Sequence, residues 1–133
     1  MTELEAKREF FKGDIFATEV TGIQIEAVGE NYAKCSLALD KKHLNAAGHP
    51  MGGAIYTLAD FTFAVSTNPH PDRVTVTTVS QICYLNPAKG KVLYAESHLI
   101  KDGRSTCFFD IDITDDLGTN IAKVTVTGTH IQK

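Results

Sequence analysis

A long apolar segment with a single charged side chain is the feature that most constrains the fold of this chain. Positions 54 to 68 contain no Gly and no Pro, and most of the residues among them are apolar. The segment follows the pair Gly52-Gly53, and its one carboxylate is Asp60. A lone acid in such a setting is costly unless it is hydrogen-bonded, paired or used in chemistry. We therefore predict a central helix over about residues 52–67 and place the candidate chemistry on it.

Segments with a period of two flank this helix on both sides. Two of them precede it and four follow it, and the later ones are rich in β-branched residues. The predicted strands are 21–27, 31–40, 73–85, 91–100, 105–114 and 119–131. The short sequences NPAKG, KDGR and DDLG separate the last four, and each contains a Gly or a turn former. We expect each to close an antiparallel hairpin.

The lengths of these elements favour one architecture. A helix of about 17 residues is roughly 25 Å long, close to the span of an eight-residue strand at about 3.3 Å per residue. We expect one α+β domain over residues 1–133, in which a curled, mostly antiparallel six-stranded sheet wraps the long helix on its concave face. A flat sheet with the helix packed on it is the alternative. Thr2 and Glu5 form a capping box, and Gly13 a stop, for a short helix over 3–12.

Composition narrows the class of partner. The chain has 133 residues, a net charge of -3 and 43% hydrophobic residues, which argues against a nucleic-acid partner. No apolar run reaches the roughly 18 to 20 residues of a membrane span, and the N-terminus does not read as a signal peptide. The cysteines Cys35, Cys83 and Cys107 lie far apart in strand-like patterns. We interpret them as buried free thiols in a reducing compartment and expect a cytosolic protein with no membrane partner.

Several motifs around the helix share a specific spacing. They are Asn45, Gly48, Gly52-Gly53, Leu58-Ala59-Asp60 and Tyr84-Leu85-Asn86-Pro87. In this spacing the chain resembles the hotdog-fold acyl-CoA thioesterases of the phenylacetate-degradation (PaaI) type. The resemblance implies the same helix-in-sheet fold, an acyl-CoA substrate and no metal or separate cofactor, because coenzyme A is part of the substrate.

The resemblance also implies roles for individual residues. Asp60 matches the helix carboxylate that serves as nucleophile or general base, Gly52 the backbone N–H that polarises the thioester carbonyl, and Asn45 the side chain that positions it. Thr77 matches the hydroxyl that some members place beside the acid. Candidates for substrate binding are Met51, Gly53, Phe63, Thr78 and, for the coenzyme A phosphates, Arg104. Met51 stands where the family usually has His.

The spacing of the two catalytic candidates predicts an assembly. Hydrolysis of a thioester needs a fixed donor for the oxyanion and a base or nucleophile on the other side of the carbonyl. Gly52 and Asp60 are eight residues apart, so one helix separates them by about 12 Å. A two-fold partner would bring Asp60 of one subunit beside Gly52 of the other. We expect a homodimer with shared active sites, and a homotetramer if the outer sheet faces also pair.

Other interpretations stay open at the level of sequence. Asp60 can be a structural acid bonded to Thr57, and the Gly pair a simple helix entry. Met51 favours a non-catalytic acyl-CoA binder, and it argues against a hydratase or dehydratase, since such enzymes pair His with an acid. The scattered His residues show no metal spacing. Asp115 and Asp116 are interpreted as solvated turn acids.

Overall fold

The elements follow one another in the expected order, with two short helices added. The computed structural model describes residues 1–133. Its helices are α1 (Glu3–Phe11), the π-helix η1 (Phe16–Thr21), the 3-10 helix η2 (Lys41–His43) and α2 (Gly52–Thr67). Its strands are β1 (Gln24–Gly29), β2 (Tyr32–Ala38), β3 (Arg73–Tyr84), β4 (Val92–Asp102), β5 (Thr106–Asp115) and β6 (Asn120–Gln132). The sequence pattern predicts neither η1 nor η2.

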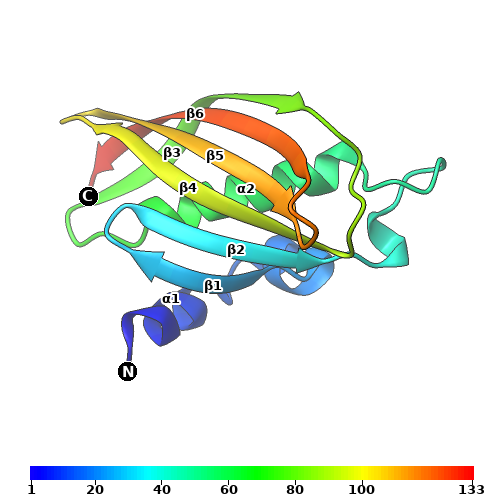
Figure 1. Cartoon of the computed structure of the whole chain (residues 1–133). Helices are drawn as coiled ribbons and strands as arrows, with labels where there is room; N and C mark the ends of the chain where they lie inside the picture. Colours follow the sequence, from blue (N-terminus) through cyan, green and yellow to red (C-terminus); the bar gives the residue numbers. More distant parts are fainter.

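The six strands form one antiparallel sheet that curls around α2 (Figure 1). The strand order is β1-β2-β4-β5-β6-β3. Leu58, Ala59 and Val65 of α2 are fully buried against the sheet, and Phe63 meets Phe109 of β5 edge to face at 5.3 Å. Each large apolar side chain buried in this way stabilises the fold by about 1.5–3 kcal/mol. The predicted α+β architecture, a long helix wrapped by a curled six-stranded sheet, is confirmed.

The connection between β3 and β4 differs from the prediction. KDGR and DDLG close the β4–β5 and β5–β6 hairpins as expected, but NPAKG does not close one. β3 pairs with β6 at the far side of the sheet, so the chain crosses over before β4 begins. The prediction of a third hairpin is therefore wrong, and β3 becomes an edge strand.

Two acids of the β5–β6 turn hold this crossover in place. Asp115 Oδ2 accepts the backbone N–H groups of Lys89 and Gly90, both at 2.9 Å. Asp116 Oδ1 accepts those of Lys91 and Val92 at 2.8 and 3.2 Å. The interpretation of these acids as merely solvated is wrong, because they replace the backbone partners that a hairpin would have supplied.

The N-terminal helix α1 contacts both the edge strand β1 and the C-terminal end of α2. Thr2 caps it by accepting the Glu5 N–H at 3.1 Å, which confirms the predicted cap. The Lys7 ammonium group donates to the carbonyl oxygens of Val65 and Asn68 at the end of α2. The carbonyl of Ile25 on the β1 edge accepts from Arg8 at 2.6 Å. α1 thus covers the β1 edge and the carbonyl end of α2.

The opposite edge of the sheet, β3, is open. Its exposed side chains include Val79, which is 65% exposed, and also Cys83. Cys35 and Cys107 are buried free thiols as predicted, but the prediction is wrong for Cys83, because no layer covers the outward face of an edge strand. No helix in the structure has both the length and the apolar character needed to cross a membrane.

Candidate active site

The first turn of α2 presents free backbone donors. Met51 is the extended N-cap residue, and Gly52 begins the helix. No residue of the chain accepts from the N–H groups of Gly52 and Gly53. The Tyr84 hydroxyl donates to the Gly52 carbonyl at 2.8 Å, and a Cβ at Gly52 would lie 2.9 Å from that hydroxyl oxygen. Two unpaired N–H groups at the positive end of a helix form a site for an oxyanion.

The loop before α2 is held by its own polar side chains. Asn45 Oδ1 accepts the N–H groups of Ala47 and His49 at 2.9 and 3.1 Å. His43 is buried and its Nε2 lies 2.7 Å from the Thr21 carbonyl oxygen. The His43 carbonyl accepts the Met51 N–H at 2.8 Å. The Asn45 side chain therefore organises this loop, and the Met51 side chain is left 59% exposed.

Asp60 lies in the middle of α2 on its solvent-facing side. Gly53, Thr57, Asp60 and Ala64 fall on one face of the helix by their spacing. The Asp60 carboxylate makes no hydrogen bond or ion pair within the chain. Thr57 donates its hydroxyl to the Gly53 carbonyl at 2.8 Å instead. The structural alternative, in which Thr57 bonds Asp60, is therefore not realised.

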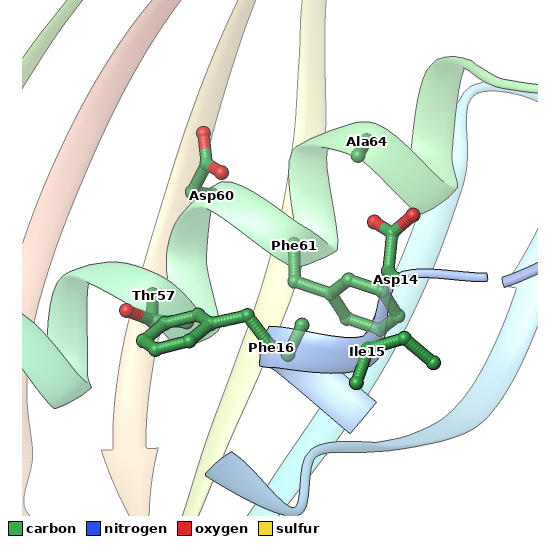
Figure 2. A pocket seen from close by; sticks show the side chains of 8 residues that line it. Asp14, Ile15, Phe16, Thr57, Asp60, Phe61 and Ala64 are labelled. Atoms are coloured by element: carbon green, nitrogen blue, oxygen red, sulfur yellow. The ribbon is translucent and has the colours of Figure 1, made fainter. Parts of the chain in front are cut away.

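A cleft of about 310 Å³ opens beside Asp60, between α2 and the segment that leads into η1 (Figure 2). Its lining residues are Asp14, Ile15, Phe16, Ala17, Thr57, Asp60, Phe61 and Ala64. Figure 2 shows the Phe61 ring extending from α2 toward Ile15 and Asp14, while the Asp60 carboxylate points away from these apolar side chains. The pKa of Asp60 is raised, first because the surrounding protein desolvates the carboxylate and second because Asp14 repels its charge. A raised pKa makes an ionised carboxylate a stronger base.

A second cleft of about 440 Å³ continues the first toward the start of α2. Phe16 and Thr57 line both clefts. The second cleft is further lined by Val20, Thr21, Lys42, His43, Met51, Gly53 and Ala54. Together the two clefts form a groove along the exposed face of α2, and we call it the α2 groove. It runs from the Asp60 carboxylate to the backbone at Gly53.

The predicted site residues divide between this groove and other places. Asp60, Met51 and Gly53 line the α2 groove, whereas Gly52 lines a separate hollow with Tyr84 and Leu85. Five other candidates line neither cleft of the groove, and one of them, Asn45, holds the loop before α2 instead. Thr77 and Thr78 are exposed on β3, Phe63 is buried in the core, and Arg104 is exposed in the β4–β5 turn.

A shift of register explains the surroundings of the two threonines. Thr77 faces Gly128 of β6 and Val79 faces Thr127, so Thr78 is the extra residue of a β-bulge. The Thr78 hydroxyl donates to the Thr127 carbonyl at 3.0 Å. The Thr77 side chain has no hydrogen-bond partner within the chain and is exposed. Of the two, Thr77 is the one whose hydroxyl stays free.

Sequence reasoning missed several residues of the groove. Asp14, Phe16 and Val20 come from the short stretch between α1 and β1, which shows neither helical nor strand periodicity. Only composition hints at a role for this stretch, because it contains three large apolar residues, Ile15, Phe16 and Val20, without a helical or strand pattern. All three remain about half exposed or more, at 49%, 64% and 55%.

A second polar cluster resembles a hydrolase triad but is built differently. Thr75 Oγ1 lies 2.7 Å from His130 Nδ1, and His130 Nε2 lies 2.7 Å from Asp102 Oδ1. Arg73 pairs with Asp102 at 3.2 Å. Burial acts to raise the pKa of Asp102, but hydrogen bonds from His130 and Arg73 outweigh it and lower that pKa. Because Thr75 is only 4% exposed, its hydroxyl cannot reach a substrate, and the cluster links β3, β4 and β6.

No three side chains of His, Cys, Asp or Glu come together in a way that could hold a metal ion. The α2 groove brings the unpaired Asp60 carboxylate and the free backbone N–H of Gly53 to one face of the helix. Residues 47–122, more than half of the chain, match the family model of the thioesterase superfamily. The chain belongs to this superfamily.

Individual relatives place it within the superfamily. A presumed esterase of Archaeoglobus fulgidus is 33% identical over 105 residues, which cover 78% of this chain and 68% of that protein. The acyl-coenzyme A thioesterase PaaI of Escherichia coli is 28% identical over 102 residues, covering 76% of this chain and 72% of that protein. This thioesterase-superfamily chain is thus a thioester hydrolase of the PaaI type, as the sequence motifs predicted.

Solved structures agree with this placement. A hypothetical thioesterase protein of Streptococcus pneumoniae, crystallised with coenzyme A, superposes with a TM-score of 0.82 at 27% identity, covering 92% of this chain and 98% of that one. The E. coli PaaI structure superposes with a TM-score of 0.82 at 22% identity, covering 97% of this chain and 96% of that one. The predicted hotdog fold is confirmed.

Proposed function

We propose that the protein is an acyl-CoA thioesterase that converts an acyl-CoA and water to a carboxylic acid and free coenzyme A. The observation that carries this proposal is a carboxylate, Asp60, without any partner, on a helix whose first two N–H groups are also without partners. Unpaired groups of opposite character are what a thioester carbonyl and an attacking water require. The S. pneumoniae relative holds coenzyme A, and the E. coli relative is an acyl-coenzyme A thioesterase.

Asp60 and Gly52 have complementary roles in this reaction. The Gly52 N–H donates to the carbonyl oxygen and stabilises the negative charge that develops there in the tetrahedral intermediate. Asp60 either takes a proton from water, whose oxygen attacks the carbonyl carbon, or attacks that carbon itself to form an anhydride that water then hydrolyses. In both cases the carbon–sulfur bond breaks and the coenzyme A thiolate leaves and is protonated.

We propose further that each active site is shared between two subunits. α2 is one continuous helix, so Gly52 and Asp60 are separated along it by about 12 Å, too far to act on one carbonyl. The open edge of β3 supports a two-fold partner, since it carries unpaired backbone groups and exposed apolar side chains such as Val76 and Val79. Pairing of two β3 edges places two α2 helices side by side. A homotetramer remains a further step of assembly.

A panel of acyl-CoAs assayed by release of free thiol tests the reaction. We expect the wild type to hydrolyse at least one member, and Asp60→Asn to lose turnover by about 10²–10⁴-fold while still binding that acyl-CoA in calorimetry. Asp72→Asn is the matched control, because Asp72 is exposed in the loop before β3. Binding of acyl-CoA by the wild type without hydrolysis of any would contradict the proposal and favour a non-catalytic binder. Full turnover by Asp60→Asn would contradict the role of Asp60.

A further inference from the structure

We infer that Asp14 is a specificity-determining residue, which together with Asp60 makes the cleft beside α2 reject acyl groups that carry a negative charge. The substrates are then coenzyme A esters of uncharged acids. This inference rests on the proposed function, because it assigns the acyl group of the thioester to the cleft that Asp60 lines.

The cleft has the chemistry of an acyl site apart from its two acids. Ile15, Phe16, Phe61 and Ala64 supply apolar wall, and the volume is about 310 Å³. It begins at Asp60, so an acyl chain whose carbonyl lies at that carboxylate has this apolar space beside it. Burial of the chain there is favourable by roughly 0.8 kcal/mol for each CH₂ group.

No positive charge offsets the two carboxylates. The residues that line this cleft include no Lys, Arg or His, and the Asp14 carboxylate takes part in no ion pair or hydrogen bond. The charge of Asp14 reaches across the cleft, because it contributes to the raised pKa of Asp60. A carboxylate on the acyl group would find no positively charged partner in this cleft and would be repelled by both acids.

The lysine that lines the groove lies in its other half. Lys42 lines the second cleft, toward the start of α2, and does not line the first. The groove is therefore negative at the acyl end and positive at the other end. An acidic acyl group gains nothing from Lys42 unless it leaves the position beside Asp60.

Backbone hydrogen bonds fix the position of Asp14 at the cleft. Its N–H donates to the Phe11 carbonyl at 3.0 Å, which extends the end of α1. Its own carbonyl accepts the Thr18 N–H and the Thr18 hydroxyl, both at 2.9 Å. Asp14 thus sits at the junction of α1 and η1, and its side chain lines the cleft beside Phe61 (Figure 2).

The test compares two coenzyme A esters of equal length that differ only at the far end of the acyl group. Pentanoyl-CoA ends in a methyl group and glutaryl-CoA in a carboxylate, and other lengths give equivalent pairs if the acyl-CoA panel favours them. We expect the wild type to prefer the methyl-ended ester in kcat/KM by tenfold or more, and Asp14→Asn to reduce this ratio by roughly tenfold. Glu19→Gln is the matched control, because Glu19 is an exposed acid of η1 that lines neither cleft, and it should leave the ratio unchanged.

The outcomes separate this inference from the proposed function. Equal kcat/KM for the two esters in the wild type, or an unchanged ratio in Asp14→Asn, would overturn the role of Asp14 while the thioesterase activity stands. Hydrolysis of no acyl-CoA at all would overturn the proposed function itself. If Asp14→Asn does not fold by circular dichroism, Asp14→Ser gives the same readout. The ratio in the wild type should also fall as salt is added, because the repulsion is between exposed charges.

Discussion

The Tyr84 hydroxyl donates a 2.8 Å hydrogen bond to the carbonyl oxygen of Gly52. This bond ties the end of the edge strand β3 to the first turn of α2, so the free N–H groups of that turn have a fixed position relative to the sheet. The proximity also explains why position 52 holds a glycine, since a Cβ there would approach the Tyr84 ring. The two residues therefore act as a unit that positions the proposed oxyanion donor.

Replacing Gly52 by Pro removes the proposed donor with little cost to the helix. Pro is favoured at the first helical position, and the extended Met51 before it, with ψ of 138°, suits a following Pro. We expect Gly52→Pro in a Tyr84→Phe background, which removes the oxygen that would lie 2.9 Å from a Cβ at position 52, to lower kcat by about 10²–10³-fold. Tyr84→Phe alone is the control and should keep most of its activity. Undiminished kcat in the double variant would show that the Gly52 N–H is not the donor.

The pH profile of kcat/KM should report the raised pKa of Asp60. The Asp60 carboxylate works in its ionised form, so activity should fall as the pH drops through the pKa of Asp60. That pKa lies above the ordinary value for Asp of about 3.9. Asp14→Asn removes the smaller of the two causes, the repulsion, so the acidic limb should move to lower pH without reaching the ordinary value. Glu19→Gln should leave the limb in place. If the acidic limb of Asp14→Asn stays at the wild-type pH or moves to higher pH, the repulsion between Asp14 and Asp60 is ruled out.

Stability should depend strongly on Asp115. This buried carboxylate accepts four backbone N–H groups, from Lys89, Gly90, Leu117 and Thr119. We expect Asp115→Ala to lower the free energy of unfolding by about 2–4 kcal/mol in urea titrations. Asp110→Ala, which removes only an exposed ion pair with Lys123, should cost less than about 0.5 kcal/mol. Equal costs for the two variants would show that the crossover does not depend on Asp115.

The pKa of Asp115 also predicts the direction in which acid changes the free energy of unfolding. Burial acts to raise the pKa of Asp115, but its backbone hydrogen bonds outweigh burial and hold that pKa well below its usual range. A folded-state pKa below the unfolded-state pKa stabilises the protein above about pH 4, and this stabilisation is lost as the pH falls toward the folded-state pKa. The difference in unfolding free energy between wild type and Asp115→Ala should therefore shrink in acid.

The contact between α1 and α2 should also be measurable. Lys7 donates to the carbonyls of Val65 and Asn68 at the end of α2, and desolvation lowers the pKa of Lys7. Lys7→Met keeps the apolar stem and removes the donors, and we expect it to lower the free energy of unfolding by about 1–2 kcal/mol. Lys12→Met is the control, since Lys12 makes only an exposed pair with Glu9. A neutral Lys7→Met would mean that water replaces the ammonium group at these carbonyls.

The elements that the sequence predicted well are those with a local signal. The apolar run and the Gly pair before it placed α2 at residues 52–67, its bounds in the structure. The Thr2 cap placed the start of α1 in the same way. The bounds of β3 were also predicted, but its pairing with β4 was predicted wrongly, because the side chains that hold the crossover, Asp115 and Asp116, come some 25 residues later in the chain. A short turn sequence cannot report partners at that distance.

The candidate site shows the same division. Asp60 and the glycines could be found from sequence, because a lone acid and a Gly pair stand out in an apolar segment. Asp14 and Phe16 could not, because their approach to α2 depends on a π-helix in a stretch with no periodicity. Tyr84 belongs to one of the sequence motifs, but its contact with Gly52 was not predicted, because it arises only where β3 runs back past the start of α2. Contacts between distant segments had to come from the fold.

Mixing two inactive variants tests the central claim most directly. One partner carries Asp60→Asn, and the other carries Gly52→Pro with Tyr84→Phe; each alone should be inactive against the best acyl-CoA. When the two are unfolded together and refolded as a mixture, a mixed dimer contains one site with an intact Asp60 from one subunit and an intact Gly52 from the other. We predict that activity returns, to about a quarter of the wild-type value if the subunits pair at random. A mixture that forms mixed dimers but stays inactive would contradict a shared active site.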